Sequence, residues 1–282
     1  MANRFGLKIL PINKQKQLMI PDLPGLLTAE PPRRSARRRN QEELILYLKI
    51  AGNAPLSESA SEQLLEKLAE VFYKTDGSTT SAMRNTADVL NKYLLDRNMR
   101  AASRGLRGVG MFTQIVLRDN RLLLAQCGES HIHFIQSGSV EHLYDPELSG
   151  SGLGVSKLYK VRYHQLEISP DQLLILSSEP PQSWAGSALK NLTKMNLDAV
   201  MERLLHRVQG NIEAALIVPR PGHRGIEILS APDEDDFSPD KIEEPESKQE
   251  EDFRPSSVLS AVKEAVSPVR EDRPESEPGL KP

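Results

Sequence analysis

The sequence is poor in cysteine, in aromatic residues and in long apolar runs, and these shortages exclude several classes of protein. One cysteine among 282 residues, Cys127, excludes an internal disulfide framework and a zinc site built from cysteines. No apolar run approaches the roughly 18 residues of a membrane-spanning helix, and the N-terminus lacks the small-residue cleavage site of a signal peptide. With 38% hydrophobic and 27% charged residues, the composition favours a soluble globular protein. We expect it to reside in a reducing, cytoplasmic compartment.

Charge is distributed unevenly along the chain. From Ala231 to Pro282 there are 16 acidic and 7 basic residues, which leaves 23 acidic and 29 basic residues in the first 230 positions. The C-terminal stretch also holds eight prolines and only two aromatic residues. Because so little apolar surface cannot offset the entropy cost of ordering, we expect residues 231–282 to form a disordered, acidic, proline-rich tail.

Residues 1–39 are predicted to form an irregular N-terminal segment with an edge strand at Phe5–Leu10. Prolines at positions 21, 24, 31 and 32 disfavour further regular structure. Five arginines follow within seven positions: Arg33, Arg34, Arg37, Arg38 and Arg39. Such a run can contact phosphate groups or nucleic acid, but no aromatic residues interleave with it to stack on bases. We therefore disfavour nucleic-acid binding and favour a solvated loop within reach of the acidic tail.

Residues 40–230 show the periodicities of an α+β domain. A short apolar strand comes first, then two helices, of which the first is predicted to open with a capping box at Ser59–Glu62. From Met111 to Leu143 the period changes to two with turns between the runs, which predicts an antiparallel meander. One further helix at Asn196–Val208 lies among the later strands. This order predicts packed antiparallel sheets with helices outside.

Five segments of this domain carry short motifs in a fixed order. They are Arg37–Glu43, Gly108–Thr113, Arg121–Ser130, His131–Leu143 and Ser169–Ser178. Together they resemble the metal-dependent protein phosphatases of the PPM type, formerly called protein phosphatase 2C. The resemblance implies two packed antiparallel β-sheets flanked by helices, and an activity that hydrolyses phosphoserine and phosphothreonine with two Mg²⁺ or Mn²⁺ ions.

The positions that correspond to the family's metal ligands are mostly degenerate. A two-metal site needs several converging carboxylates, because these hard cations prefer oxygen ligands and their charge must be balanced. The resemblance places the family's metal-site positions at Glu42, Ala51, Gly52, Ser178, Gly210 and Asn211. Three of the family's aspartates would therefore be Ala51, Ser178 and Gly210. In the first motif, Glu42 would be the remaining ligand.

The same first motif contains the family's phosphate-holding arginine, which would be Arg37 or Arg38. Glu129 stands where the family has the aspartate of its Gly-Asp-Ser motif. We therefore expect no catalytic residues and no bound metal, and interpret the chain as a pseudophosphatase that binds a protein partner, such as a phosphoprotein or a kinase.

Two alternatives stay open. One is an active serine/threonine phosphatase that recruits Mg²⁺ or Mn²⁺ through a rebuilt site containing Glu42, Glu129 and Glu179. The other is a protein that binds anions or nucleic acid through the arginine-rich loop. Separately, His131 and His133 point to the same face of a strand and would supply two metal ligands, but the sequence shows no third one, so ordinary packing is favoured.

Overall fold

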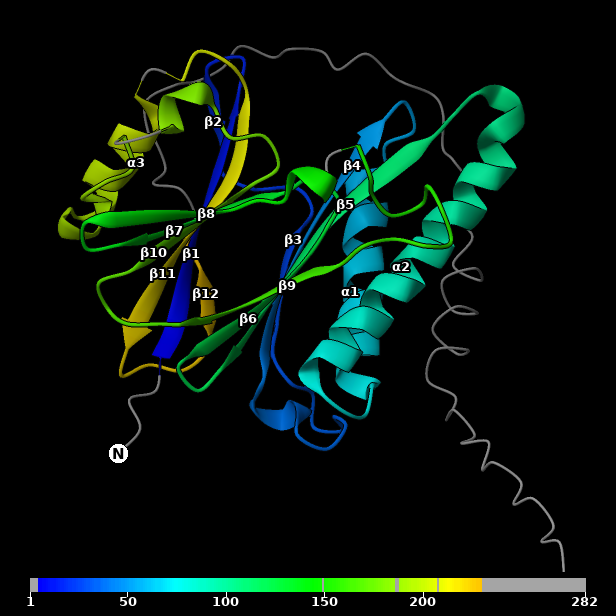
Figure 1. Cartoon of the computed structure of the whole chain (residues 1–282), viewed down its shortest axis with the longest axis horizontal. Coiled ribbons are helices and arrows are strands. Elements are labelled where there is room, and N and C mark those ends of the chain that lie inside the picture. Colours follow the sequence, from blue (N-terminus) through cyan, green and yellow to red (C-terminus); the bar gives the residue numbers. More distant parts are fainter. Residues whose placement is uncertain (1–4, 149, 186–187, 207, 230–282) are drawn as a thin grey trace, which may run out of the picture.

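The computed structural model describes residues 5–148, 150–185, 188–206 and 208–229 of the chain (Figure 1). Two β-sheets pack face to face, and helices cover the outer face of each. Sheet A has the order β12 (Ile226–Ile228), β1 (Phe5–Gln15), β11 (Ile212–Pro221), β10 (Leu173–Ser177), β7 (His131–Gln136) and β8 (Ser139–Leu143), with β2 (Leu18–Ile20) also paired to β1. Sheet B has the order β3 (Leu26–Ala29), β4 (Glu43–Gly52), β5 (Gly108–Arg118), β6 (Arg121–Cys127) and β9 (Arg162–Glu167).

The helices form the two outer layers. Helices α1 (Glu58–Lys74) and α2 (Thr79–Ala101) lie on sheet B, and α3 (Leu197–Leu205) lies on sheet A. Short 3₁₀ turns connect the elements: η1 (Arg39–Gln41), η2 (Ala102–Arg104), η3 (Pro146–Leu148), η4 (Gln182–Trp184) and η5 (Leu192–Lys194). All strand pairs are antiparallel except β1 with β12. The predicted α+β architecture of two packed antiparallel sheets flanked by helices is confirmed.

Strand β4 shows how the sequence builds these layers. Its side chains alternate between the two faces of sheet B, as a period of two requires. Leu44, Leu46 and Leu48 pack against α1 and α2, whereas Ile45 and Tyr47 pack into the layer between the sheets. All five are buried, so β4 contributes to the core on both faces of sheet B.

The N-terminal segment departs from its prediction. β1 lies inside sheet A rather than at its edge, because it pairs with β11 from Phe5 to Lys14 and with β12 on its other side. Leu7 and Ile9 are buried in the layer between the sheets. Residues 5–29 thus supply β1 and β2 to sheet A and β3 to sheet B.

Each long helix begins at a serine or asparagine cap. The Ser57 hydroxyl accepts a hydrogen bond from the backbone N–H of Ala60, so the cap of α1 lies two residues before Ser59, where the capping box was predicted. Ser78 caps α2 and Asn196 caps α3 in the same way. The predicted tail, residues 231–282, lies outside the described residues.

Candidate functional site

Five of the sequence-predicted positions lie at one end of the sandwich. Ala51 and Gly52 end β4, Ser178 follows β10, and Gly210 and Asn211 precede β11. Gly52 is paired with Gly108, and Ser177 is paired with both His131 and Ala214, so these strand ends are level within each sheet. We call this end of the sandwich, defined by Ala51, Gly52, Ser178, Gly210 and Asn211, the rim.

Glu42 lies at the opposite end. It immediately precedes Glu43, the first residue of β4, whereas Ala51 and Gly52 are the last two. At about 3.4 Å per residue, the nine steps from Glu42 to Ala51 span roughly 30 Å. Glu42 therefore cannot share a metal ion with ligands at the rim.

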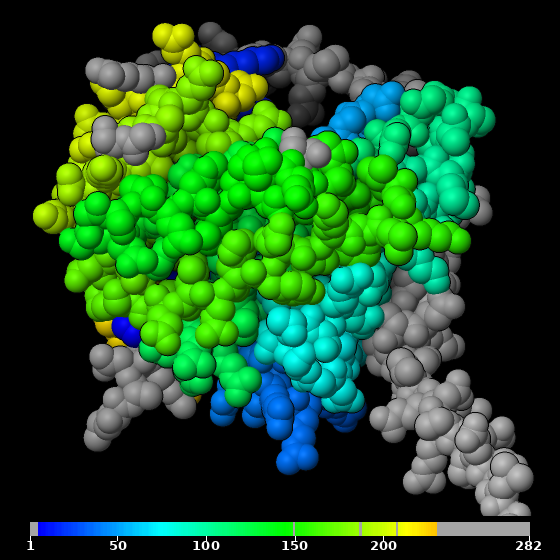
Figure 2. Space-filling model, in the orientation of Figure 1, coloured from blue at the N-terminus to red at the C-terminus, as the bar shows by residue number. Residues whose placement is uncertain are grey.

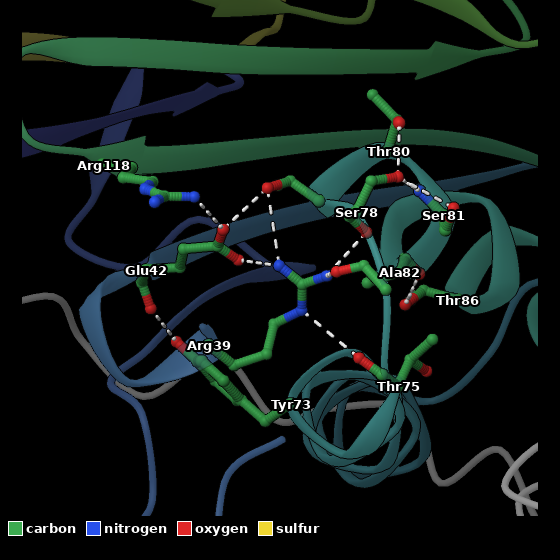
Figure 3. A network of polar contacts seen from close by, with 12 residues as sticks. Arg39, Glu42, Tyr73, Thr75, Ser78, Thr80, Ser81, Ala82, Thr86 and Arg118 are labelled. Carbon is green, nitrogen blue, oxygen red and sulfur yellow. Dashed lines mark hydrogen bonds and ion pairs between the residues drawn. The ribbon is translucent and has the colours of Figure 1, made fainter. Parts of the chain in front are cut away.

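The Glu42 carboxylate is fully occupied by neighbouring donors (Figure 3). Arg39 forms a buried ion pair with Oε2, and the Thr79 hydroxyl donates to Oε1 at 2.6 Å. Arg118 Nη1 lies 3.6 Å from the same Oε1. Both side chains of the ion pair are at most 1% exposed. Because an isolated buried charge is costly, this pairing compensates the burial of both side chains.

Arg39 joins η1 to the turn between α1 and α2. Its Nη2 donates to the carbonyl oxygens of Gly77 at 2.8 Å and Ser78 at 2.6 Å, and its Nε donates to that of Thr75 at 3.3 Å. The guanidinium also lies over the ring of Phe72, 5.3 Å from its centroid. The candidate phosphate-binding residues Arg37 and Arg38 are both exposed. Arg39 is therefore the buried arginine of this run, and its role is structural.

The rim carries an ion pair, Lys49 with Glu213, that none of the sequence motifs includes. Lys49 lies two residues before Ala51 and, by the alternation of β4, on the same inner face. Lys49 Nζ lies 2.5 Å from Glu213 Oε2, and this contact joins β4 of sheet B to β11 of sheet A. The ion pair also shows that the rim ends of the two sheets lie on the same side of the sandwich. The sequence signal for a cation at the rim is the spacing of Lys49, two residues before Ala51 on the same strand.

Two buried hydroxyl groups lie behind this ion pair. Tyr47 and Thr113 are direct partners across β4 and β5, and both are buried. The Thr113 hydroxyl has no hydrogen-bond partner among the described residues, and the Tyr47 hydroxyl lies beside Ser178 without a hydrogen bond of normal geometry. Burial, followed by the negative charge of Glu213, raises the pKa of the Tyr47 phenol far above its usual range. Tyr47 is therefore a neutral group and cannot replace a carboxylate ligand.

These donors do not fit a pair of Mg²⁺ or Mn²⁺ ions. Glu213 is engaged by the Lys49 ammonium, Ser178 offers a neutral hydroxyl, and Asn211 Oδ1 accepts a hydrogen bond from the backbone N–H of Lys16 at 3.0 Å. Across residues 5–148, 150–185, 188–206 and 208–229, no three His, Cys, Asp or Glu side chains are grouped so that they could hold a metal ion. A dinuclear site needs several converging carboxylates. At the rim, Glu213 is already neutralised by Lys49, and Glu179, which directly follows Ser178, adds a second carboxylate but does not complete a metal-binding group.

Gly52 is required by the backbone at this position. Its φ angle is +106°, and a Cβ atom there would lie 2.3 Å from the carbonyl oxygen of Arg107. Its presence at the rim is thus explained by steric limits alone.

Three histidines form a stacked cluster on the outer face of sheet A. His142 on β8 is the direct cross-strand partner of His133, with their ring centroids 4.3 Å apart. His131 Nδ1 lies 3.0 Å from His142 Nε2, and its ring stacks on Tyr144 at 4.2 Å. Burial lowers the pKa of all three histidines, and the pKa of His133 falls to about 4. The rings stack and do not converge on a common point, so the favoured interpretation of packing accounts for His131 and His133.

No family model matches the sequence, and no curated protein matches it either. Several solved structures are similar. A variant of a bacterial serine phosphatase superposes with a TM-score of 0.58 at 13% identity, over 77% of this chain and 99% of that one. The S. agalactiae serine/threonine phosphatase has a TM-score of 0.54 at 14% identity, over 76% of this chain and 99% of that one.

A third similar structure is the catalytic domain of the serine/threonine protein phosphatase PstP in complex with two manganese ions. Its TM-score is 0.53 at 13% identity, over 77% of this chain and 99% of that one. The chain therefore has the fold of the PPM-type serine/threonine phosphatases. In the described ranges, no helix is both long enough and apolar enough to span a membrane.

Proposed function

We propose that this PPM-type fold is catalytically inactive and serves as a regulatory module that binds a protein partner. The observation that carries the proposal is the Lys49–Glu213 ion pair, whose Nζ–Oε2 distance is 2.5 Å. An ammonium group held between the two sheets repels divalent cations, and it neutralises the carboxylate that would otherwise attract them. The residues at Ala51, Ser178 and Gly210 offer no carboxylate in compensation.

The location of Glu42 supports the same proposal. A rebuilt metal site would need Glu42 near Glu129 or Glu179, but Glu42 lies at the other end of β4 and is committed to Arg39 and Thr79. The expected partner is a phosphoprotein or a kinase, because the similar folds belong to enzymes that act on phosphorylated serine and threonine. The proposal includes a cytoplasmic location.

An assay series on the full chain tests the absence of catalysis. Hydrolysis of para-nitrophenyl phosphate and of a phosphoserine peptide is followed while Mn²⁺ is raised, for the wild type and for Glu213→Ala. We expect equal background rates in both, with no dependence on Mn²⁺. Turnover that saturates with Mn²⁺ in the wild type and falls to background in Glu213→Ala would contradict the proposal.

A second arm tests the partner class with the same peptide. Fluorescence anisotropy compares the labelled phosphoserine peptide with its unphosphorylated form, in the presence of a chelator. Tighter binding of the phosphorylated form without metal supports a phosphoprotein partner. Equal binding of the two forms, or none, would exclude recognition of phosphoserine by this domain.

A further inference from the structure

The loop between β3 and β4 presents four arginines that nothing in the described part of the chain neutralises. Arg33, Arg34, Arg37 and Arg38 are all exposed, and none of them forms an ion pair or a side-chain hydrogen bond within the described ranges. We call these four residues the arginine loop. In the space-filling view, the blue segment that contains η1 projects from the lower side of the molecule (Figure 2).

The backbone of this loop is anchored to the rest of the fold, although its arginine side chains are exposed. The backbone N–H of Ala36 donates to the carbonyl oxygen of Tyr73 at 2.8 Å, and the Ser35 hydroxyl donates to that of Pro32 at 2.6 Å. The next residue, Arg39, is anchored in the buried network with Glu42. Because the backbone of the loop is already ordered, the loop itself loses little additional backbone entropy when a ligand binds.

The chemistry of the arginine loop selects an acidic polypeptide as its ligand. Residues 31–38 contain no aromatic side chain on which a nucleic-acid base could stack. None of the exposed large hydrophobic residues of the described chain belongs to this segment, so it offers no apolar contact area to a membrane or to an apolar partner. Guanidinium groups pair well with carboxylates, often through two parallel hydrogen bonds.

The chain itself contains an acidic stretch of suitable charge. Residues 233–252 hold 11 Asp and Glu against two lysines, a net charge of −9. The last described residue is Leu229, whose backbone N–H donates to the carbonyl oxygen of Ile9. The acidic stretch thus begins four residues beyond a fixed point of the fold.

Strand β12 begins near the base of the arginine loop and runs parallel to β1, so the last described residue, Leu229, lies one short strand away from that base, beside Ile9. Gly225, immediately before β12, donates its backbone N–H to Glu43 Oε1 at 3.1 Å, and a side chain at Gly225 would lie 3.5 Å from Glu30 Oε1. Glu30 and Glu43 flank the arginine loop on its two sides. The four steps from Gly225 to Leu229 cover roughly 13 Å. A flexible segment of ten residues has a root-mean-square span of about 18 Å, which exceeds that distance, so the acidic stretch has the reach to return to the loop.

We propose that the arginine loop is a docking surface for acidic polypeptide and that residues 233–252 of the same chain occupy it. The tether gives this segment a high local concentration, so an external acidic partner must compete with it for the arginines. The contact does not depend on the catalytic state of the domain, and Mn²⁺-dependent turnover would leave it standing.

Zero-length coupling in the full chain tests the contact. In a variant with Arg33→Lys, Arg34→Lys, Arg37→Lys and Arg38→Lys, the charge is kept and a carbodiimide can join each new amine to a carboxylate that touches it. Exposed Lys190 is the internal control. We expect intramolecular coupling from the loop to residues 233–252 at a yield several-fold above that of Lys190. The coupling should be lost in about 1 M NaCl, where the Debye length is about 3 Å.

Three results would overturn the proposal: coupling no stronger than that of Lys190, coupling unaffected by salt, or coupling only between separate chains. A double variant with only Arg37→Lys and Arg38→Lys gives the same readout if the fourfold change disturbs folding. As a second measurement, charge reversal to glutamate at the four positions should enlarge the Stokes radius of the full chain at low salt. An unchanged radius would also count against the contact.

Discussion

Replacement of Glu42 by alanine separates a structural role from a metal-binding role. In the structure the substitution leaves the Arg39 guanidinium, which is 1% exposed, without its anionic partner. Removal of one member of a buried ion pair costs about 3–5 kcal/mol, because the remaining charge stays buried without compensation. Loss of the acceptor for Thr79 adds to this cost. We therefore expect Glu42→Ala to lower the free energy of unfolding by about 4 kcal/mol, a large part of the typical 5–15 kcal/mol.

Urea unfolding followed by circular dichroism measures this loss. Glu167→Ala is the matched control, because Glu167 is 72% exposed and its Oε1 lies 3.8 Å from Arg121 Nε, so its removal should cost at most about 1 kcal/mol. The double variant Arg39→Met with Glu42→Leu removes both charges. It should be less destabilised than the sum of its single variants by about 1–3 kcal/mol.

A small effect of Glu42→Ala, comparable with that of Glu167→Ala, would refute this reasoning. So would additive losses in the double variant, because the two side chains would then not be coupled. A loss of Mn²⁺ binding with unchanged stability would instead give Glu42 the role of a metal ligand.

Three further variants or conditions test other parts of the account. The pKa of His133 is lowered to about 4, chiefly by burial, so the unfolded state takes up a proton near pH 6.5 while the folded state stays unprotonated. The free energy of unfolding should therefore be highest above pH 6.5 and fall toward pH 4, by up to about 1.4 kcal/mol per pH unit. In His133→Gln, the urea midpoint should depend less on pH. Burial raises the pKa of the Cys127 thiol to about 12, so a disulfide reagent should label it only in urea; rapid labelling of the native protein would contradict its burial. Gly52→Ala should cost about 2 kcal/mol because of its positive φ and the adjacent carbonyl oxygen, whereas Gly105→Ala, with no atom within 4 Å of its Cβ, should cost less; equal losses would remove the steric explanation.

The layers of the fold were predictable because their signals are local. The helical stripe of Leu64, Leu68 and Phe72 and the strand run of β4 each repeat within a few residues, and all of these apolar side chains are buried as expected. The position of β1 was not predictable in the same way. Its long partner β11 lies about two hundred residues away, and no local pattern encodes such a pairing.

The candidate site was predictable only where strand ends and motif positions coincide. Ala51 and Ser178 both lie at the rim, because Ala51 is the penultimate residue of β4 and Ser178 directly follows β10. The short motif Arg37–Glu43 predicts Glu42 as a metal ligand, but a motif carries no information on topology, and Glu42 lies at the opposite end of β4 from the rim. The partner of Lys49 is 164 positions away, so the ion pair at the rim has no sequence signature of its own.

The histidine cluster was predictable in part from the sequence. Its third member, His142, follows from the register of the β7–β8 hairpin, in which Gln136 faces Ser139 across a two-residue turn. Counting back along both strands from that turn places His142 opposite His133. The cluster could therefore have been completed from the sequence once the turn was fixed.

Calorimetric titration of the full chain with Mn²⁺ tests most directly our central proposal, which is that the rim carries an ammonium–carboxylate pair in place of a metal site. The account predicts no saturable heat of binding in the wild type, and the same result for Glu213→Ala. Stoichiometric binding of two Mn²⁺ ions in the wild type, abolished by Glu213→Ala, would contradict it, because Glu213 would then be a metal ligand and Lys49 only its neighbour.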